Sequence, residues 1–461
     1  SRIAWSFAPS PDTNAAALTI LFYPRGSPKP ANPPAMQNSV LVHRGVSRYN
    51  ELRLQNAFAV IYDLFSLYLY IILYSSHKVK AWRHKFMTEI FLIRHTQAEG
   101  NLYRMMQGHW DGDVTAHGWE QIAALAERLR NVPIDAVYSS DLYRARMTAG
   151  AVTKYHPLTL NIDKRLREID VGPWETGFFG NIFHDFPDEA EKFVRRPSQW
   201  HIDGAETFME VKRRAYPALC EIAERHDGER VAVVSHGVTI RCIMSKITGI
   251  PLDEVDELPI FFNTSVTTLE YADGAFTVKG ANDCAHLAAL NSPVWRRLSA
   301  LRDELLDPRE EREFYAGCYA DAWRAAHGGL EGYDEQMYLA AARNHHDDDP
   351  GAVLKILDGD EPVGLVDMDT RRGAERGEGW ISLIWLREDY RGKGYGIQLL
   401  ARAIKKYTNL GRTALRLHVA EKNTAAVRFY KSCGFTVLSR EQRTTGPLLL
   451  MGRELGGRKY V

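Results

Sequence analysis

Two short apolar runs that each end in a histidine constrain the fold of this chain most strongly. Residues 88–96 read TEIFLIRHT, and residues 231–237 read VAVVSHG. Each run has the length and the branched apolar content of a buried strand. Between them, apolar residues recur at helical spacing over Trp119–Arg130, and a strand-like AVYSS occupies 136–140. This alternation predicts a mostly parallel sheet that is covered by helices.

Ligands of such sheets bind outside the carboxyl ends of the strands. The first run ends in Arg94-His95 and the second in His236-Gly237. We therefore expect the two histidines to meet at one crevice, although they are far apart in the sequence. Arginine offers planar paired donors, so this crevice is suited to an anionic ligand.

Five motifs follow one another in a fixed order in this part of the chain. They are RHT at 94–96, Asn101, SSDLYRARMTA at 139–149, LREIDVGPWE at 166–175 and SHG at 235–237. The ordered set resembles the histidine phosphatase superfamily, over about residues 88–285. The resemblance implies a phosphoglycerate mutase-like three-layer α/β/α domain that hydrolyses a phosphate monoester without a metal.

The resemblance also assigns roles to individual residues. His95 would be the nucleophile, and Glu168 would protonate the leaving oxygen. The phosphoryl oxygens would be held by Arg94, Arg144 and His236, with substrate contacts from Asn101, Gln107 and Gly237. Arg144 precedes an alanine, as the family pattern requires, so Arg146 is expected to be exposed.

One departure concerns the loop near the substrate. The family often reads W-E-G where this chain has Trp174-Glu175-Thr176, with the glycine delayed to Gly177. The interval before the second histidine is short and aromatic-rich, and GAET at 204–207 replaces the family's G-G-E-S. The departure at Thr176 concerns the substrate preference, whereas the shorter interval and GAET favour a phosphatase over a phosphoglycerate-type mutase, which stays the alternative.

A second set of motifs lies near the end of the chain. The strand-like GWISLIWLRED at 379–389 leads into YRGKGYG at 390–396 and then into a helix. Glycines before a helix N-terminus let backbone N–H groups approach an anion closely. Residues 415–435 read LRLHVAEKNTAAVRFYKSCGF. The two segments together resemble the GNAT acetyltransferases, over about 305–455, and imply an α+β domain that uses acetyl-CoA to acetylate a small-molecule or peptide amine.

By this resemblance, the pyrophosphate of coenzyme A would be cradled by Arg391, Gly392, Lys393, Gly394, Tyr395 and Gly396. The backbone at Leu386 would bond the pantetheine arm, Asn423 would position the cofactor, and Tyr430 would protonate the departing thiolate. The general base stays open between Glu378, Glu388 and an ordered water. The run HHDDDP at 345–350 is interpreted as a solvated loop, because consecutive residues cannot all converge on one metal ion.

The motifs imply a division of the chain. We expect a poorly ordered extension over 1–86, a phosphatase domain over 87–285, a charged helical connector over 286–308 and an acetyltransferase domain over 309–456. The extension contains an apolar segment at 57–74, which is a candidate membrane anchor. It is also consistent with translated upstream sequence that has no function, and we prefer that interpretation.

Composition narrows the classes further. Lys plus Arg and Asp plus Glu each total 58, so the formal net charge is zero and argues against a nucleic-acid partner. The five cysteines form no C-x-x-C pair, which predicts no zinc site and fits a reducing cytoplasm. We therefore predict a cytoplasmic bifunctional enzyme. The alternatives are one active half beside a binding module, and a membrane-anchored protein if 57–74 spans a bilayer.

Overall fold

The computed structural model describes residues 3–4, 21–22, 87–258, 260–290, 298–444 and 446–456. The chain divides into two compact units, 1–81 and 82–461. In the first unit, the described residues form two strands, β1 (Ile3–Ala4) and β2 (Leu21–Phe22), which pair antiparallel. The expectations for 57–74 and for the rest of the extension lie outside the described residues. No helix in the described ranges is long and apolar enough to cross a membrane.

The second unit contains two sheets, and the first lies in residues 87–290, here called the first domain. Its strand order is β5-β4-β6-β3-β7-β8. The strands are β3 (Thr88–Arg94), β4 (Ala136–Ser139), β5 (Leu160–Ile162), β6 (Arg230–Ser235), β7 (Val266–Ala272) and β8 (Ala275–Asp283). The first four run parallel, and β7 and β8 add an antiparallel edge. The predicted, mostly parallel sheet is therefore confirmed.

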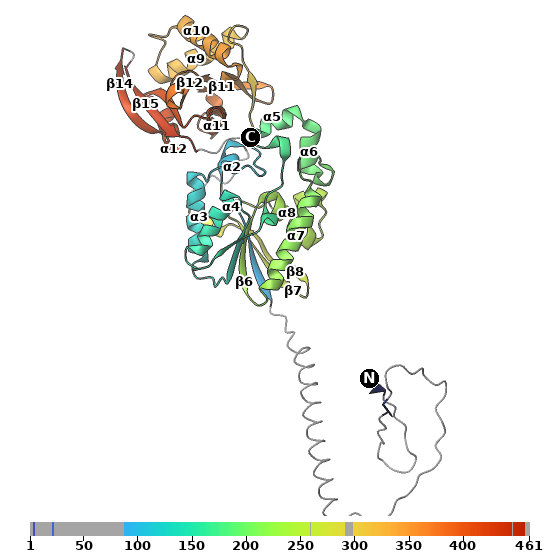
Figure 1. Cartoon of the computed structure of the whole chain (residues 1–461). Coiled ribbons are helices and arrows are strands. Elements are labelled where there is room, and N and C mark those ends of the chain that lie inside the picture. Colours follow the sequence, from blue (N-terminus) through green and yellow to red (C-terminus); the bar gives the residue numbers. More distant parts are fainter. Residues whose placement is uncertain are drawn as a thin grey trace, which may run out of the picture. The chain divides into compact units, whose positions relative to one another are not determined.

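Helices cover both faces of this sheet, which makes three layers (Figure 1). The larger helices are α3 (Ala116–Leu129), α4 (Tyr143–Thr153), α7 (Phe208–Arg225) and α8 (Gly237–Thr248), and the shorter ones are α2 (Glu99–Tyr103), α5 (Phe179–Asp185) and α6 (Pro187–Arg195). On β3, Ile90 and Leu92 pack in the core under α7 and α8, whereas Ile93 packs in the core under α3 and α4. Both faces of the central strands are apolar, as the continuous hydrophobic runs predicted.

The second sheet lies in residues 298–456, here called the second domain, and has the order β14-β15-β13-β12-β11-β10-β9. Its strands are β9 (Arg302–Leu305), β10 (Val353–Asp358), β11 (Glu361–Asp369), β12 (Glu378–Leu386), β13 (Ala414–Ala420), β14 (Thr436–Arg443) and β15 (Gly446–Glu454). All neighbouring strands are antiparallel except β12 and β13. That parallel pairing joins only Glu378–Ile381 to Ala414–Leu417. Beyond Ile381 the two strands are not paired with each other, and β12 carries a register irregularity there.

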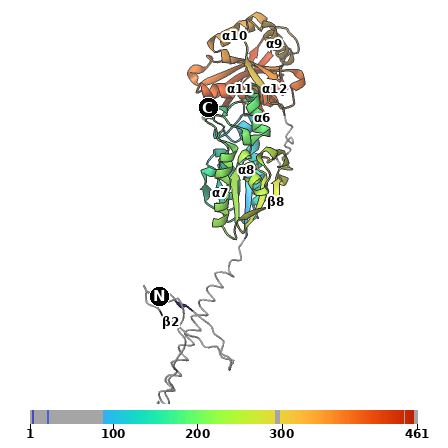
Figure 2. The ribbon, with the colours of Figure 1, turned by 90° about the vertical axis from the view of Figure 1, so that its right-hand side faces the viewer.

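Helices α9 (Arg312–His327) and α10 (Glu335–Asp348) cover one face of this sheet, and α11 (Gly396–Asn409) and α12 (Thr424–Ser432) lie on the other (Figure 2). Leu339 and Leu365 belong to the first of these cores, and Leu399 and Leu415 to the second. The sheet of this α+β domain therefore has an apolar core on each face. Residues of α9 and α10 on one face and of α12 on the other line the cavity where β12 and β13 diverge.

Two local expectations are wrong. The segment expected as a helical connector contains β9, which pairs with β10 and is an edge strand of the second sheet. Residues 291–297 of that connector lie outside the described ranges. The HHDDDP run is not a solvated loop, because it ends helix α10 and buries His345, whose imidazole contacts Asp367 and Asp369.

Candidate active sites

The pairing of β3 with β6 brings the two sequence-predicted histidines together. Arg94 lies opposite Ser235 in this parallel pair, and the backbone N–H of His95 donates to the Ser235 carbonyl at 2.9 Å. The residue that follows each strand is a histidine, so both rings lie at the same sheet edge. The ring centroids of His95 and His236 are 5.0 Å apart.

The His95 ring is oriented by one short hydrogen bond. Its Nδ1 atom lies 2.6 Å from the Thr96 carbonyl oxygen, which can only accept, so Nδ1 carries the proton. The other nitrogen, Nε2, is left with its lone pair. Burial and the nearby guanidinium groups of Arg144 and Arg94 lower the pKa of His95 well below 6.5. The ring is therefore neutral at physiological pH.

Two buried arginines flank the histidines. Arg144 donates to the Trp110 carbonyl at 2.9 Å and to the Gly108 carbonyl at 2.8 Å, and burial lowers its pKa to about 10. Arg94 donates to the Phe261 carbonyl. The Nε atoms of both arginines are buried and have no hydrogen-bond partner within the described residues. Buried donors of this kind normally have a partner, so both are suited to bind an anion.

His236 supplies a third unpartnered atom. Its Nε2 lies 2.7 Å from the Ser140 hydroxyl, whereas its buried Nδ1 has no partner in the described part of the chain. Burial lowers the pKa of His236 well below 6.5, so the ring is neutral. Arg146, in contrast to the buried Arg144, is exposed. The choice between the two arginines that the sequence suggested agrees with this difference in burial.

The Glu168 carboxylate lies at the N-terminus of α8, the helix that begins at Gly237, directly after His236. Its carboxylate accepts from the backbone N–H of Val238 at 3.0 Å and of Thr239 at 3.2 Å. Carboxylates are stabilised at helix N-termini by the free N–H groups and the helix dipole. This contact fixes the Glu168 side chain beside the two histidine-bearing strand ends.

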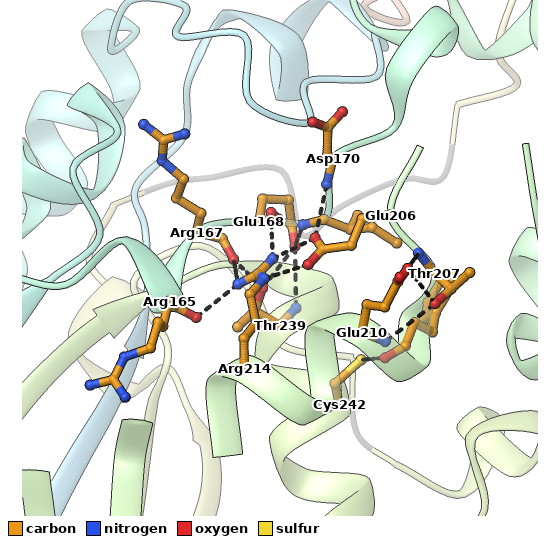
Figure 3. Close-up of polar contacts among 12 residues, drawn as sticks. Arg165, Arg167, Glu168, Asp170, Glu206, Thr207, Glu210, Arg214, Thr239 and Cys242 are labelled. Carbon is orange, nitrogen blue, oxygen red and sulfur yellow. Dashed lines mark hydrogen bonds and ion pairs between the residues drawn. The ribbon is translucent and has the colours of Figure 1, made fainter. Parts of the chain in front are cut away.

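A polar network, drawn in Figure 3, supports the segment that carries Glu168. The guanidinium of Arg214 donates to the carbonyls of Arg165, Arg167 and Glu168 at 2.8–2.9 Å and pairs with both carboxylate oxygens of Glu206. Glu206 in turn accepts from the Asp170 N–H at 3.3 Å. Glu206 belongs to the GAET motif, so this motif holds Arg214 and thereby the backbone of the segment that carries Glu168.

A cavity of about 240 Å³ lies at this sheet edge; His236 is not among its lining residues, although Gly237 beside it is. The predicted residues that line it are Arg94, His95, Asn101, Gln107, Arg144, Glu168 and Gly237. The rest of the lining is mostly apolar and aromatic, with Met105, Met106, Phe179, Phe193 and Ile260 among its residues and with one further cation, Arg241. The cavity thus combines a cationic base with an apolar wall.

The second domain has its own predicted loop, between β12 and α11. Gly392 and Gly394 adopt φ values of +69° and +95°, which L-residues with a side chain rarely adopt. A Cβ at Gly396 would meet the Phe429 ring at 3.2 Å. The glycines are therefore required by the backbone, and the N–H groups of the loop and of the first turn of α11 are suited to hold a pyrophosphate.

Two of the predicted cofactor contacts have other partners here. The Arg391 side chain donates to the Leu386 carbonyl at 2.7 Å and pairs with Asp321. The Arg391 guanidinium therefore points toward β12, and only the backbone of this residue is left for the cradle. The Leu386 carbonyl already accepts this hydrogen bond from Arg391. The diverging part of β12 before it, Ser382–Trp385, is the better candidate for a backbone contact with the pantetheine arm.

A cavity of about 460 Å³ lies where β12 and β13 diverge, and both Asn423 and Tyr430 line it. The Asn423 side chain caps α12 by accepting from the Ala426 N–H at 3.1 Å. Burial raises the pKa of Tyr430, which keeps its hydroxyl protonated. The Tyr430 hydroxyl therefore remains protonated where its side chain lines this cavity.

Neither of the two suggested general bases lines that cavity. Glu378 pairs with Arg416 and Arg376, and Glu388 is exposed. Among the lining side chains, His345 pairs with two carboxylates, which raise its pKa to about 10 against the effect of burial. His418 also lines the cavity, and burial lowers its pKa, so this ring is neutral and able to accept a proton.

Known families account for both domains. Residues 90–284 match the model of the histidine phosphatase superfamily (branch 1), and residues 311–435 match that of the acetyltransferase (GNAT) family. A probable phosphoglycerate mutase GpmB of Salmonella choleraesuis (strain SC-B67) is 30% identical over 208 residues, which are 44% of this chain and 96% of the relative. The chain belongs to the histidine phosphatase superfamily. Its second domain is a GNAT domain.

Solved structures are similar to the phosphatase domain as well. YhfR of Bacillus stearothermophilus is 34% identical, with 43% of this chain and 99% of that chain covered and a TM-score of 0.43. A mycobacterial glucosyl-3-phosphoglycerate phosphatase, in complex with VO3, is 28% identical, with 42% and 98% covered and a TM-score of 0.39.

Several residues of the phosphatase site were missed in the sequence. Asn263 donates to the His95 carbonyl at 2.8 Å, Arg214 holds the Glu168 segment, and Ser140 contacts His236. Ser140 stands in the SSD motif and could have been singled out there. Asn263 and Arg214 lie in no recognised motif, and only the folded chain brings them to the site. In the described ranges, no group of three His, Cys, Asp or Glu side chains is placed to hold a metal ion.

Proposed function

We propose that the phosphatase domain hydrolyses phosphate monoesters through a phosphohistidine on His95. The observations that carry this proposal are a lone pair on Nε2 of His95 and three buried nitrogens, on Arg94, Arg144 and His236, that have no partner in the described residues. Arg94 and Arg144 line one cavity with His95, and the His236 ring lies beside the His95 ring. Phosphoryl transfer needs little besides a positioned nucleophile and donors for the equatorial oxygens.

The first step forms a bond between Nε2 of His95 and phosphorus while the ester P–O bond breaks. The leaving oxygen takes a proton from Glu168. In the second step a water oxygen attacks phosphorus, its proton returns to Glu168, and the N–P bond breaks to give inorganic phosphate.

A phosphoglycerate mutase is the second candidate, since the curated relative bears the name of one. A phosphoglycerate carries a carboxylate besides its phosphate, and recognition of both needs further cations. The cavity lining offers Arg241 beyond the phosphate-binding arginines and is otherwise mainly apolar on the leaving-group side. This composition favours a phosphate ester with an apolar leaving group, and hydrolysis.

Assays of the full chain with p-nitrophenyl phosphate and with 3-phosphoglycerate distinguish the phosphatase activity from the mutase activity. We expect inorganic phosphate from the aromatic ester, with one oxygen from labelled water. Interconversion of phosphoglycerates without net phosphate release would support the mutase and overturn hydrolysis.

We further propose that the GNAT domain transfers an acetyl group from acetyl-CoA to an amine. The glycine loop 392–396 and the divergence of β12 from β13 fit coenzyme A, whose thioester supplies the activated acetyl group. Asn423 and Tyr430 line the cavity at this divergence, and the Tyr430 hydroxyl would protonate the leaving thiolate. Calorimetry with coenzyme A, followed by thiol release in the presence of a panel of amines, tests this activity.

The bifunctional assignment rests on two intact constellations in one chain. We propose the cytoplasm as its compartment, since its five cysteines are free. Fractionation of the full-length protein tests this: recovery in the membrane pellet at modest salt would contradict it and would favour an anchor at 57–74.

A further inference from the structure

Thr176 adopts a backbone conformation that its side chain disfavours. Its φ is +58°, and the residue is fully buried. Left-handed backbone is uncommon for residues other than glycine, and for a β-branched residue it is strained. Such strain persists only where the surroundings fix the backbone. The contacts of Thr176 therefore matter for the loop to which it belongs.

The backbone of Thr176 is paired with the substrate loop of the phosphatase site. Its N–H donates to the Met106 carbonyl, and the Met106 N–H donates to the Gly177 carbonyl, both at 2.9 Å. Met105, Met106, Gln107 and Gly108 line the phosphate cavity. The Gly108 carbonyl is also one of the two acceptors that hold Arg144. A displacement at Thr176 would therefore move both the cavity wall and an arginine that binds phosphate.

The remaining backbone group of Thr176, its carbonyl, is bound by the GNAT domain. Lys405, on α11, donates from Nζ to the Thr176 oxygen at 2.7 Å. One turn earlier, the Arg402 guanidinium lies 3.9 Å from the centroid of the Phe178 ring.

A second contact between the two domains lies close to the contact of Lys405 with Thr176. The side chain of Asn181 makes two hydrogen bonds to the backbone of Asp303 on β9, at 2.9 and 3.2 Å. The Asp303 carboxylate in turn pairs with Arg402 at 2.9 Å. Beside these polar pairs the two domains share an apolar cluster, in which Met105 and Phe178 pack with residues of the GNAT domain. Lys405 is the group that reaches the strained residue.

We propose that Lys405 of the GNAT domain is a positioning residue of the phosphatase site, which it supports through the Thr176 carbonyl. The proposal rests on the proposed phosphatase function, since it concerns the loop that lines that cavity. It makes helix α11 a structural part of both sites: its first turn adjoins the glycine loop, and Lys405 reaches the phosphatase domain from its last third.

The matched variants are Lys405→Met and Lys406→Met in the full chain. Lys406 is the neighbouring lysine on α11, and it pairs with Asp349 inside the GNAT domain. Two readouts are used: KM and kcat for p-nitrophenyl phosphate, and the affinity for inorganic phosphate by calorimetry. We expect Lys405→Met to weaken phosphate binding about tenfold, the size of a coupling between residues in contact, with Lys406→Met close to wild type.

A double-mutant cycle with Thr176→Gly excludes a general loss of structure. Glycine accepts the left-handed conformation without strain, so the loop no longer needs the lysine. In that background Lys405→Met should cost less than about threefold in phosphate affinity. Coenzyme A binding, measured on each variant, reports whether α11 is intact.

Two results would overturn the inference: unchanged phosphate affinity in Lys405→Met, or an equal loss from that variant in the wild-type and Thr176→Gly backgrounds. Phosphate affinity is measured without turnover, so failure of wild-type hydrolysis would count against the proposed function alone. The binding data would still decide the positioning claim in that case.

Discussion

The imidazole rings of His95 and His236 have centroids 5.0 Å apart because the two strands that precede them are parallel neighbours. Each ring is tied by one hydrogen bond, His95 to the Thr96 carbonyl and His236 to the Ser140 hydroxyl. One nitrogen of each ring is thereby left without a protein partner within the described residues. The account of the phosphatase site depends on these two nitrogens facing one phosphoryl group.

The protonation of His95 is the first testable consequence. Its folded-state pKa lies well below 6.5, because burial and Arg144 disfavour the cation. The nucleophile should therefore stay neutral, and hydrolysis should not lose activity with a midpoint near pH 6.5. Nuclear magnetic resonance titration of the His95 ring measures this directly. A midpoint at or above the ordinary value would contradict the neutral nucleophile.

The support of Glu168 gives the second prediction. Glu206→Gln weakens the carboxylate pair that holds Arg214, and Arg214 holds three backbone carbonyls around Glu168. We expect kcat for p-nitrophenyl phosphate to fall about tenfold, as for loss of a charged pair that orients a catalytic group.

Glu210→Gln is the matched control for that variant. Glu210 lies four residues away and belongs to the capping box with Thr207 at the start of α7, as Figure 3 also shows. Its loss should lower stability slightly and leave kcat unchanged. Equal effects of the two variants on kcat would remove Glu206 from the support of Glu168.

The glycine loop of the GNAT domain gives the third. Gly394→Val places a β-branched side chain at a φ of +95°, in the loop that would hold the pyrophosphate. Coenzyme A affinity should fall at least about a hundredfold, since a preorganised set of N–H donors is lost. Gly411→Val is the control, because Gly411 has a φ of +73° just after the other end of α11, with open space around its Cβ position. It should strain the backbone without weakening coenzyme A binding; similar losses in both variants would refute the cradle.

His345 gives a prediction about stability. Its folded pKa of about 10 exceeds the ordinary 6.5, so its pairs with Asp367 and Asp369 contribute stability that is complete below pH 6.5 and is lost as the pH rises through about 10. His345→Gln should destabilise the GNAT domain by about 3 kcal/mol at neutral pH, the cost of breaking a buried pair. Denaturant unfolding of wild type and variant at pH 7 and pH 10 should show this difference shrinking. A difference that does not depend on pH would contradict the ionic account.

The sequence predicted the elements whose apolar pattern is local. The strands before His95 and His236, and the helix that begins at Gly396, follow from continuous runs and glycine positions. The choice of Arg144 over Arg146 came from a motif and agrees with the burial of the two side chains.

Features that depend on distant partners could not be predicted from the sequence. Strand β9 has only four residues, three of them charged, and it is a strand because β10 offers it an edge. His345 is buried because β11 presents two carboxylates to α10. The contact of Lys405 with Thr176 joins two domains and leaves no local pattern at either residue.

Trapping of a phosphorylated intermediate tests the central claim most directly. The full chain is mixed with a radiolabelled phosphate monoester, quenched in alkali, in which phosphohistidine survives, and digested for peptide mapping. We predict label on the peptide that contains His95, and neither label nor turnover in His95→Asn, with coenzyme A binding retained. Turnover without a labelled His95 peptide, or undiminished turnover in His95→Asn, would contradict the account.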